Sequence, residues 1–294
     1  MPADLHLHSI YSDGSCTPAR LIELAREKGL DTVALADHDT VAGIGEMIEA
    51  GAEKGIQVIP AIEFSTYQGE VELHILGYFI DYSSPSFQAE IKKLYEKRKE
   101  RAAGMIARLN ELGVRLSYQE VRNLAGSDYI GRPHIARAMV EAGHIREMKD
   151  AFSSEYIGNG GQAYLPKYKL DTAETIQLIH EYGGLAVLAH PYYVNGRDFM
   201  DKEGIEVLVK YGLDGLEVYH SKHSREATAY YLQIARELGL LVSGGSDFHG
   251  ANSPGLEIGD IRLADKYVKR IRDYYQKRKT SSRLAQKRNC PHII

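Results

Sequence analysis

The strongest constraint on the fold of this chain is a repeated alternation of short apolar runs with amphipathic stretches of helical period. Such alternation is typical of βα units that build a parallel sheet. The apolar runs predict strands over residues 3–8, 32–36, 57–62, 185–189, 215–219 and 240–244. A hairpin is predicted after the third run, with residues 71–79 as its clearer arm. The pattern predicts an α/β protein built on a barrel or on an open doubly wound sheet.

Residues 87–163 interrupt this rhythm, because the strand pattern disappears there. The stretch predicts several helices instead, over residues 89–112, 117–124, 133–141 and 145–156. We therefore predict a barrel domain made of residues 1–86 and 164–264, a helical insertion or lid at 87–163, and a basic helical tail at 265–294.

The composition of the 294 residues excludes several classes of protein. No run of 18 apolar residues is present, so neither a membrane span nor membrane association is expected. Cys16 and Cys290 are the two cysteines and neither lies in a C-x-x-C motif, which argues against disulfide scaffolds and thiolate metal sites. We expect a cytoplasmic protein and no obligate protein partner.

Charge is unevenly distributed along the chain. The tail from Asp265 onward carries ten Lys or Arg against two Asp, whereas the body before it is acidic. This basic tail could attract nucleic acid. The alternative, which we favour, is a solvated helix that docks on the body through Val268, Ile271 and Tyr275 at three- and four-residue spacing.

Histidines and acids follow the predicted strands at the point where each strand ends. His6 and His8 lie two residues apart on one extended strand, so both imidazoles face the same side. The carboxyl ends of barrel strands meet at one face, so residues far apart in sequence would meet there. The polar groups that end the other strands are Asp37-His38-Asp39, Glu63, His190, His220 and Ser246-Asp247-Phe248-His249.

A set of nitrogen and oxygen ligands rich in histidine suits Zn, Mn or Fe. More than six such ligands implies more than one ion. Asp37 and Asp39 are expected to orient imidazoles or to cap the following helix rather than to bind metal directly.

Seven ordered motifs together resemble the polymerase and histidinol phosphatase (PHP) family. They run from the first predicted strand to the last and leave out only the lid and the tail. The motifs are His6-Leu7-His8, Ser12-Asp13-Gly14, Asp37-His38-Asp39, Glu63, His74-Ile75-Leu76-Gly77-Tyr78, Ala189-His190-Pro191 and Gly245-Ser246-Asp247-Phe248-His249.

The resemblance implies a distorted (β/α)₇ barrel with two or three divalent ions, Mn, Zn or Fe, at its C-terminal face. The ligand sets that it implies are His6, His8, Glu63 and Asp247 for one ion, Glu63, His74 and His190 for a second, and Asp13, His38 and His249 for a third. Some family members carry a histidine where this chain has Asp13, so the third site is expected to be weaker or to prefer a harder ion such as Mn.

The lid motif Gly131-Arg132-Pro133-His134 resembles that of stand-alone PHP phosphoesterases that act on nucleoside 3′,5′-bisphosphates and short RNAs. Arg132 and His134 are therefore candidate substrate ligands, although each could instead serve the helix that begins there. His223 is a further candidate contact with substrate, and His220 is the candidate proton donor to the leaving oxygen.

The predicted enzyme is a phosphoric ester hydrolase that attacks with a metal-bridged hydroxide. Its expected substrate is the 3′-phosphate of a nucleoside 3′,5′-bisphosphate, with trimming of short RNA from the 5′ end as a related activity. Histidinol phosphate is the alternative substrate within the family. A non-catalytic nucleic-acid-binding polymerase-accessory module is the alternative of a different class.

Overall fold

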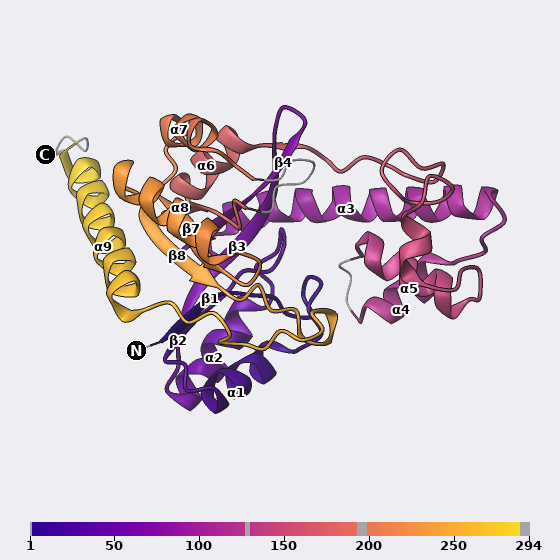
Figure 1. Ribbon diagram of the computed structural model, residues 1–294, viewed down its shortest axis with the longest axis horizontal. Helices are drawn as coiled ribbons and strands as arrows, with labels where there is room; N and C mark the ends of the chain where they lie inside the picture. Colours follow the sequence, from indigo (N-terminus) through magenta and orange to yellow (C-terminus); the bar gives the residue numbers. More distant parts are fainter. Residues whose placement is uncertain (1, 127–129, 193–198, 289–294) are drawn as a thin grey trace, which may run out of the picture.

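The computed structural model describes residues 2–126, 130–192 and 199–288 (Figure 1). Its strands are β1 (Ala3–Leu7), β2 (Thr32–Leu35), β3 (Gln57–Gln68), β4 (Val71–Tyr78), β5 (Leu170–Asp171), β6 (Leu185–Leu188), β7 (Gly215–His220) and β8 (Leu241–Gly245). Its α-helices are α1 (Pro18–Glu27), α2 (Ile44–Lys54), α3 (Pro85–Glu111), α4 (Tyr118–Ala125), α5 (Arg132–Glu141), α6 (Thr172–Glu181), α7 (Lys202–Tyr211), α8 (Arg225–Glu237) and α9 (Asp265–Arg288). Two short 3₁₀ helices are η1 (Met148–Phe152) and η2 (Gly250–Asn252).

The strands form a nearly closed barrel in the order β1-β2-β3-β4-β6-β7-β8, with the short β5 beside β3. The predicted hairpin is present, and β4 runs antiparallel to both β3 and β6, while the other pairs are parallel. The end of β8 closes the barrel on β1, because Asp247 N donates to His6 O at 2.9 Å and His8 N donates to Phe248 O at 3.0 Å. The predicted distorted α/β barrel is confirmed.

The amino-terminal half of the barrel is filled by apolar side chains. Small and branched residues from successive strands share one buried cluster, in which Leu5 and Leu241 are packed with Val268 and Ile271 of α9. Tyr275 of α9 stacks on Phe79 with ring centroids 4.3 Å apart. Helix α9 therefore docks on the body through these residues, as its apolar spacing predicted, and the structure places the contact at the amino-terminal end of the barrel. Residues 289–294 of the predicted tail lie outside the described residues.

Irregularities in two strands turn polar side chains toward the other end of the barrel. The register of β1 against β2 shifts between Asp4 and Leu7, so that Leu5 packs in the interior cluster and Leu7 in a cluster on the outside. The register of β7 against β8 shifts between Glu217 and Tyr219. Such bulges re-aim side chains next to functional sites.

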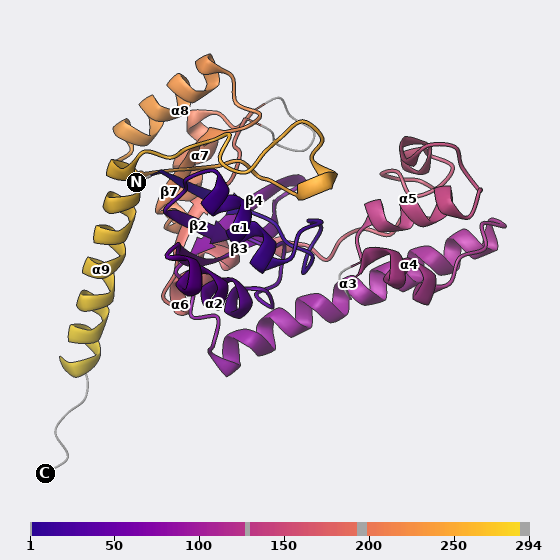
Figure 2. The same cartoon turned by 90° about the horizontal axis from the view of Figure 1, so that it is seen from below.

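Helix α3 runs from the barrel to a separate group of short helices, on the side opposite α9 (Figures 1 and 2). This group has a hydrophobic cluster of its own, which includes Met105 of α3, Val121 of α4 and Met139 of α5. Helix α4 begins with a capping box, in which Ser117 and Glu120 each accept a backbone hydrogen bond from the other.

Three elements differ from the sequence-based expectation. The helix predicted over residues 145–156 is wrong, since only η1 forms and the chain then folds back so that Gly158 N donates to Ser153 O. Helix α7 was not predicted, because Gly204 in its first turn weakens the helical pattern that Ile205 and Leu208 carry. The two-residue β5 was also missed. No helix in the described part of the chain is long and apolar enough to cross a membrane.

Candidate metal centre

Glu63 is the centre of the polar cluster at the carboxyl ends of the strands. Its carboxylate is buried and lies within 3.3 Å of five imidazoles. Glu63 Oε2 is 3.2 Å from His6 Nε2, 3.3 Å from His8 Nε2 and 3.1 Å from His38 Nδ1. Glu63 Oε1 is 2.8 Å from His74 Nδ1 and 2.9 Å from His190 Nε2. One carboxylate therefore joins side chains from four strands and their following loops.

Two further carboxylates extend the cluster. Asp247 Oδ1 lies 3.2 Å from His8 Nε2 and 3.6 Å from His6 Nε2. Asp13 Oδ1 lies 3.2 Å from His249 Nε2 and Asp13 Oδ2 lies 3.8 Å from His38 Nε2. The structure thus places all nine residues expected as metal ligands in one cluster.

Glycines allow the chain to come close enough for these contacts. A side chain at Gly14 would have its Cβ 2.3 Å from His8 O, so the turn that returns Asp13 toward His8 requires glycine. A Cβ at Gly245 would lie 2.4 Å from both His6 N and His6 Cβ. The backbone of Asp247 itself has a φ of 59°, and Asp39 and His190 also have positive φ. Such backbone conformations gather at functional sites.

The donor set fits divalent cations. Several atoms of the cluster are buried and lack a hydrogen-bond partner among the described residues, and these are His6 Nε2, His8 Nε2, His38 Nδ1 and Glu63 Oε2. Buried polar atoms without partners are costly unless an ion or a water satisfies them. A tetrahedral ion with ligand bonds of about 2.0 Å separates neighbouring ligand atoms by about 3.3 Å, which matches the 3.1–3.3 Å between these atoms. Four overlapping groups of described side chains have spacings that could each hold an ion: His6, His8, Glu63 and Asp247; His8, Asp13, His38 and His249; His38, Glu63 and His74; and His6, Glu217 and His220.

The pKa values of Glu63 and His8 show that the buried carboxylates of the cluster attract positive charge. Burial would raise the pKa of Glu63, but the charges of His38, His6 and His74 hold it well below its usual range. Burial alone would lower the pKa of His8, yet Asp247 and Glu63 raise it to about 10. Burial lowers the pKa of His38 to about 3. The buried carboxylates thus stay ionised and draw cations or protons to the imidazoles, and a divalent cation meets the same demand.

Glu217 belongs to this site although sequence reasoning missed it. Its buried carboxylate accepts a hydrogen bond from His190 N at 2.8 Å through Oε2 and lies 3.0 Å from His6 Nδ1 through Oε1. A carboxylate at Nδ1 keeps the proton there and leaves Nε2 of His6 as the ligand atom. The sequence did contain a signal that could have identified this residue, because Glu217 is an acid within the apolar run of β7.

The acids on either side of His38 act differently from the expectation that they orient imidazoles or cap a helix. Asp37 accepts hydrogen bonds from Ser9 N, Ser9 Oγ and Ser12 Oγ, so it holds the loop that follows β1. Asp39 accepts from Ser65 N and forms an ion pair with Arg98 of α3. Asp37 still supports an imidazole indirectly, because Ser12 Oγ, which donates to Asp37, lies 3.5 Å from His8 Nδ1. For Asp39 the expectation was wrong, because Ser65 and Arg98 hold its carboxylate.

Three residues that follow β7 lie on one side of the cluster. His220 Nε2 is 3.4 Å from Asp247 Oδ2, and its Nδ1 accepts a hydrogen bond from Lys222 N, so the proton lies on Nε2. His223 lies beside His220, and its Nδ1 lies 2.9 Å from Val218 O. Burial lowers the pKa of His223 to about 4. The Lys222 ammonium, which was not predicted, lines the metal cavity 4.0 Å from Asp247.

The two predicted lid residues are held by contacts within the lid. His134 Nδ1 accepts a hydrogen bond from Gly131 N at 3.1 Å and so serves the start of its own helix; burial lowers its pKa, and the charge of Asp13 acts in the opposite direction. Arg132 donates to Ile157 O and Asn159 Oδ1 and lies over the ring of Tyr164.

Two arginines of α3 accompany Arg132. Burial first, then the charges of Arg132 and Arg98, lower the pKa of Arg101. One guanidinium nitrogen of Arg101, Nη2, is buried without a hydrogen-bond partner among the described residues. The guanidinium groups of Arg98, Arg101 and Arg132 repel one another, and Arg101 offers a buried N–H donor. Together they could bind an anion. Sequence reasoning missed Arg98 and Arg101 because they lie within a basic run of a long helix.

Comparison with known proteins identifies the family. The model of the PHP domain matches residues 4–278, nearly the whole chain. The chain belongs to the PHP family. This PHP protein is 33% identical over 261 residues to the 3′,5′-nucleoside bisphosphate phosphatase of Chromobacterium violaceum, which covers 87% of this chain and 90% of the relative. It is also 33% identical over 258 residues to the 5′-3′ exoribonuclease Rnm of Escherichia coli, with 87% of each chain covered.

A solved structure agrees with this assignment. A candidate metal-dependent phosphoesterase from Bifidobacterium adolescentis superposes with a TM-score of 0.82 at 34% identity, over 92% of this chain and 94% of the other. The PHP protein described here is a phosphoric ester hydrolase, and its His, Asp and Glu clusters indicate divalent metal binding. Family membership favours an enzyme over the non-catalytic module considered from sequence.

Proposed function

We propose that this enzyme hydrolyses the 3′-phosphoryl group of nucleotides that also carry a 5′-phosphate. The preferred substrate is a nucleoside 3′,5′-bisphosphate, and trimming of short 5′-phosphorylated RNA from its 5′ end is the related activity. The observation that carries the proposal is a cluster of three buried or half-buried carboxylates and six imidazoles that adjoins a group of three arginines. The relatives named above support the same substrate class.

Two or three divalent ions, Mn, Zn or Fe, are assigned to the cluster. His6, His8, Glu63 and Asp247 would hold the first; Glu63, His74 and His190 the second; and Asp13, His38 and His249 the third. When bound, such ions lower the pKa of water toward about 7 and neutralise phosphoryl oxygens. The chain itself supplies a cavity of about 230 Å³ beside these ligands, in which a phosphate can lie.

The arginine group would bind the second phosphate of the substrate. Arg98 is fixed next to the metal centre by its ion pair with Asp39, the residue that follows His38. Arg101 offers a buried N–H, and Arg132 is held beside it by the lid. A phosphate oxygen bound there would relieve the repulsion between the guanidinium groups. Histidinol phosphate carries one phosphate and would leave this group without a partner, so we rank it below a bisphosphate.

His220 remains the candidate proton donor to the leaving 3′-oxygen. Its Nε2–H faces Asp247 across 3.4 Å, so the donor proton is already directed toward the cluster. His134, whose Nδ1 accepts a backbone N–H, would present its own Nε2–H to the substrate phosphate. His223 supports His220 from behind, with their ring centroids 5.3 Å apart. We treat residues 87–163 as the lid that brings Arg132 and His134 to the site.

The test is product formation by the purified, Mn-loaded enzyme from three substrates: inorganic phosphate from adenosine 3′,5′-bisphosphate and from histidinol phosphate, and nucleoside 5′-monophosphate from a 5′-phosphorylated trinucleotide. We expect kcat/KM to be highest for the bisphosphate. Replacing Arg101 by Gln should lower kcat/KM for the bisphosphate by about 10- to 100-fold, since a charge-assisted pair with a buried donor contributes about 1.5–3 kcal/mol.

Arg137→Gln is the matched control, because Arg137 is an exposed lid residue paired with Glu141. Equal rates on all three substrates, or equal losses in both variants, would contradict the proposed substrate class.

A further inference from the structure

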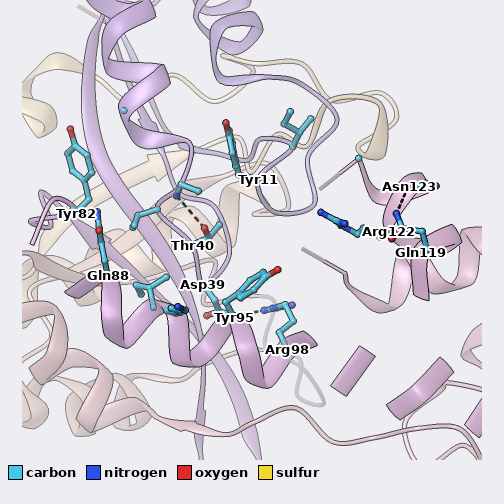
Figure 3. Close-up of a pocket in the computed structure, with 17 residues that line it drawn as sticks. Tyr11, Asp39, Thr40, Tyr82, Gln88, Tyr95, Arg98, Gln119, Arg122 and Asn123 are labelled. Atoms are coloured by element: carbon cyan, nitrogen blue, oxygen red, sulfur yellow. Dashed lines mark hydrogen bonds and ion pairs between the residues drawn. The ribbon is translucent and has the colours of Figure 1, made fainter. Parts of the chain in front are cut away.

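A large open cavity lies next to the metal centre rather than in it. It has a volume of about 1280 Å³ and is bordered mainly by α3, α4 and the loops that follow β1 and β2. Figure 3 shows Tyr11 and Thr40 on the barrel side, Tyr95 and Arg98 on α3, and Arg122 across the open space on α4. The proposed reaction at the metal centre does not involve most of the residues that line this cavity.

The charges that line the cavity favour an anionic ligand. Lys92, Arg98 and Arg122 are the cationic side chains, and Asp39 is the single carboxylate among the described residues that line it. Asp39 is paired with Arg98, so the balance stays positive. This wall belongs to a body that is acidic before the C-terminal helix, so its positive charge is a local feature.

Aromatic rings alternate with these charges. Tyr11, Tyr82 and Tyr95 line the cavity, and each is half-buried with part of its side chain exposed. The Tyr11 hydroxyl donates to Glu46 at 3.3 Å, which fixes the ring at the wall. Tyrosine rings interleaved with Lys and Arg are the features on which single-stranded nucleic acids stack and are neutralised.

The loops that carry metal ligands also border the cavity. Tyr11 lies on the loop between His8 and Asp13, and Asp39 directly follows His38. Arg98 lines both this cavity and a smaller one that contains Arg101. A chain of nucleotides with its 5′-phosphate at the arginine group and its first linkage at the metal centre would enter the cavity beside Tyr11 and continue along α3 past Tyr95 toward Lys92.

We infer that this cavity binds the nucleotides of a single-stranded RNA that lie on the 3′ side of the phosphate held at the metal centre. The inference rests on the proposed function and names an additional binding site for it. Sites for single small ligands usually have volumes of about 300–1000 Å³. The cavity exceeds that range, so it has room for more than one nucleotide.

The first measurement is affinity against chain length for the Mn-loaded full chain. The probes are adenosine 3′,5′-bisphosphate and 5′-phosphorylated oligoadenylates of two, three and five nucleotides whose first linkage carries a non-hydrolysable methylene bridge. The Kd should fall with each added nucleotide until the cavity is filled, because stacking of one base changes Kd by about five- to 150-fold. A Kd that does not change from the bisphosphate to the pentanucleotide would overturn the inference.

The second measurement compares variants of α3. Lys92→Glu and the double variant Lys92→Glu/Tyr95→Ala should raise the Kd for the pentanucleotide, relative to that for the bisphosphate, by at least tenfold in the double variant. Lys93→Glu is the matched control, because Lys93 is the next residue, is 68% exposed and pairs with Glu90 outside the cavity. It changes the net charge equally and should alter both affinities by less than about twofold.

Lys92 is exposed on the helix surface, so its single variant keeps the result interpretable if the double variant folds poorly. An unchanged ratio in Lys92→Glu, or an equal effect in Lys93→Glu, would overturn the inference. Failure of the proposed function is a separate outcome, since absence of phosphate release from the bisphosphate would refute the activity while the affinities still test the cavity.

Discussion

Replacing Glu217 by Gln tests how the barrel prepares a metal ligand. The change keeps the size of the side chain and removes one charge and one acceptor oxygen. In the native protein the two carboxylate oxygens serve His6 Nδ1 at 3.0 Å and His190 N at 2.8 Å. An amide has one oxygen for these two partners, so one of them must face the NH₂ group instead.

Both arrangements weaken the metal centre. If the amide oxygen accepts from His190 N, the NH₂ group donates to His6 Nδ1, which moves the proton of His6 to Nε2 and blocks the ligand atom. If the oxygen faces His6, two N–H donors oppose each other at His190, at a cost of about 1–3 kcal/mol. Loss of such a supporting contact lowers metal affinity by about 10- to 100-fold, which equals about 1.4–2.7 kcal/mol.

The assay is calorimetric titration of the metal-free protein with Mn²⁺ at neutral pH. Asp214→Asn is the control, because Asp214 precedes β7 at the opposite end of the barrel, where it accepts from Ala186 N and pairs with His180 and Arg278. That variant should lose stability but bind Mn²⁺ as tightly as the native protein. A Glu217→Gln protein whose Mn²⁺ affinity stays within twofold of the native value would refute the reasoning.

Three further outcomes follow from the site and its frame. Removal of divalent ions with EDTA should lower the melting temperature measured by calorimetry. Added Mn²⁺ should raise it again in proportion to the logarithm of the Mn²⁺ concentration. An unchanged melting temperature would argue against a metal centre. Asp13→Asn should reduce the bound metal by about one ion per chain in elemental analysis while the remaining ions stay, and unchanged stoichiometry would contradict the assignment of the third site. Gly245→Ala should force β8 away from His6 and lower both the unfolding free energy, by about 1–3 kcal/mol or more, and the metal content. Gly45→Ala in α2, where a Cβ has no atom within 4 Å, should instead stabilise the protein by about 0.5–1 kcal/mol in denaturant titrations.

Local pattern accounts for the parts of the structure that were predicted well. The period of two in β1 placed His6 and His8 on one side, and their ring centroids lie 5.1 Å apart. Threonine followed by proline is a local start signal for a helix, and α1 begins at Pro18 with Thr17 accepting a hydrogen bond from Arg20 N. These signals reside in neighbouring residues, so they could be read before any tertiary contact was known.

The functional residues that were missed depend on contacts between distant segments. An acid within β7 can face solvent or the interior, and only closure of the barrel turns Glu217 toward His6 across 211 positions of sequence. Arg98 and Arg101 lie in a basic run that resembles any solvated helix face, until α3 carries them past Asp39 and beside Arg132.

Residue type and spacing along the chain were enough to predict the βα alternation, the polar residues that end the strands and the family. The side chains that support the cluster, and the positive groups beside it, could be found only in the folded molecule. Burial, closure of the barrel and the path of α3 set the environment of each charge, and that environment controls its pKa and its partners.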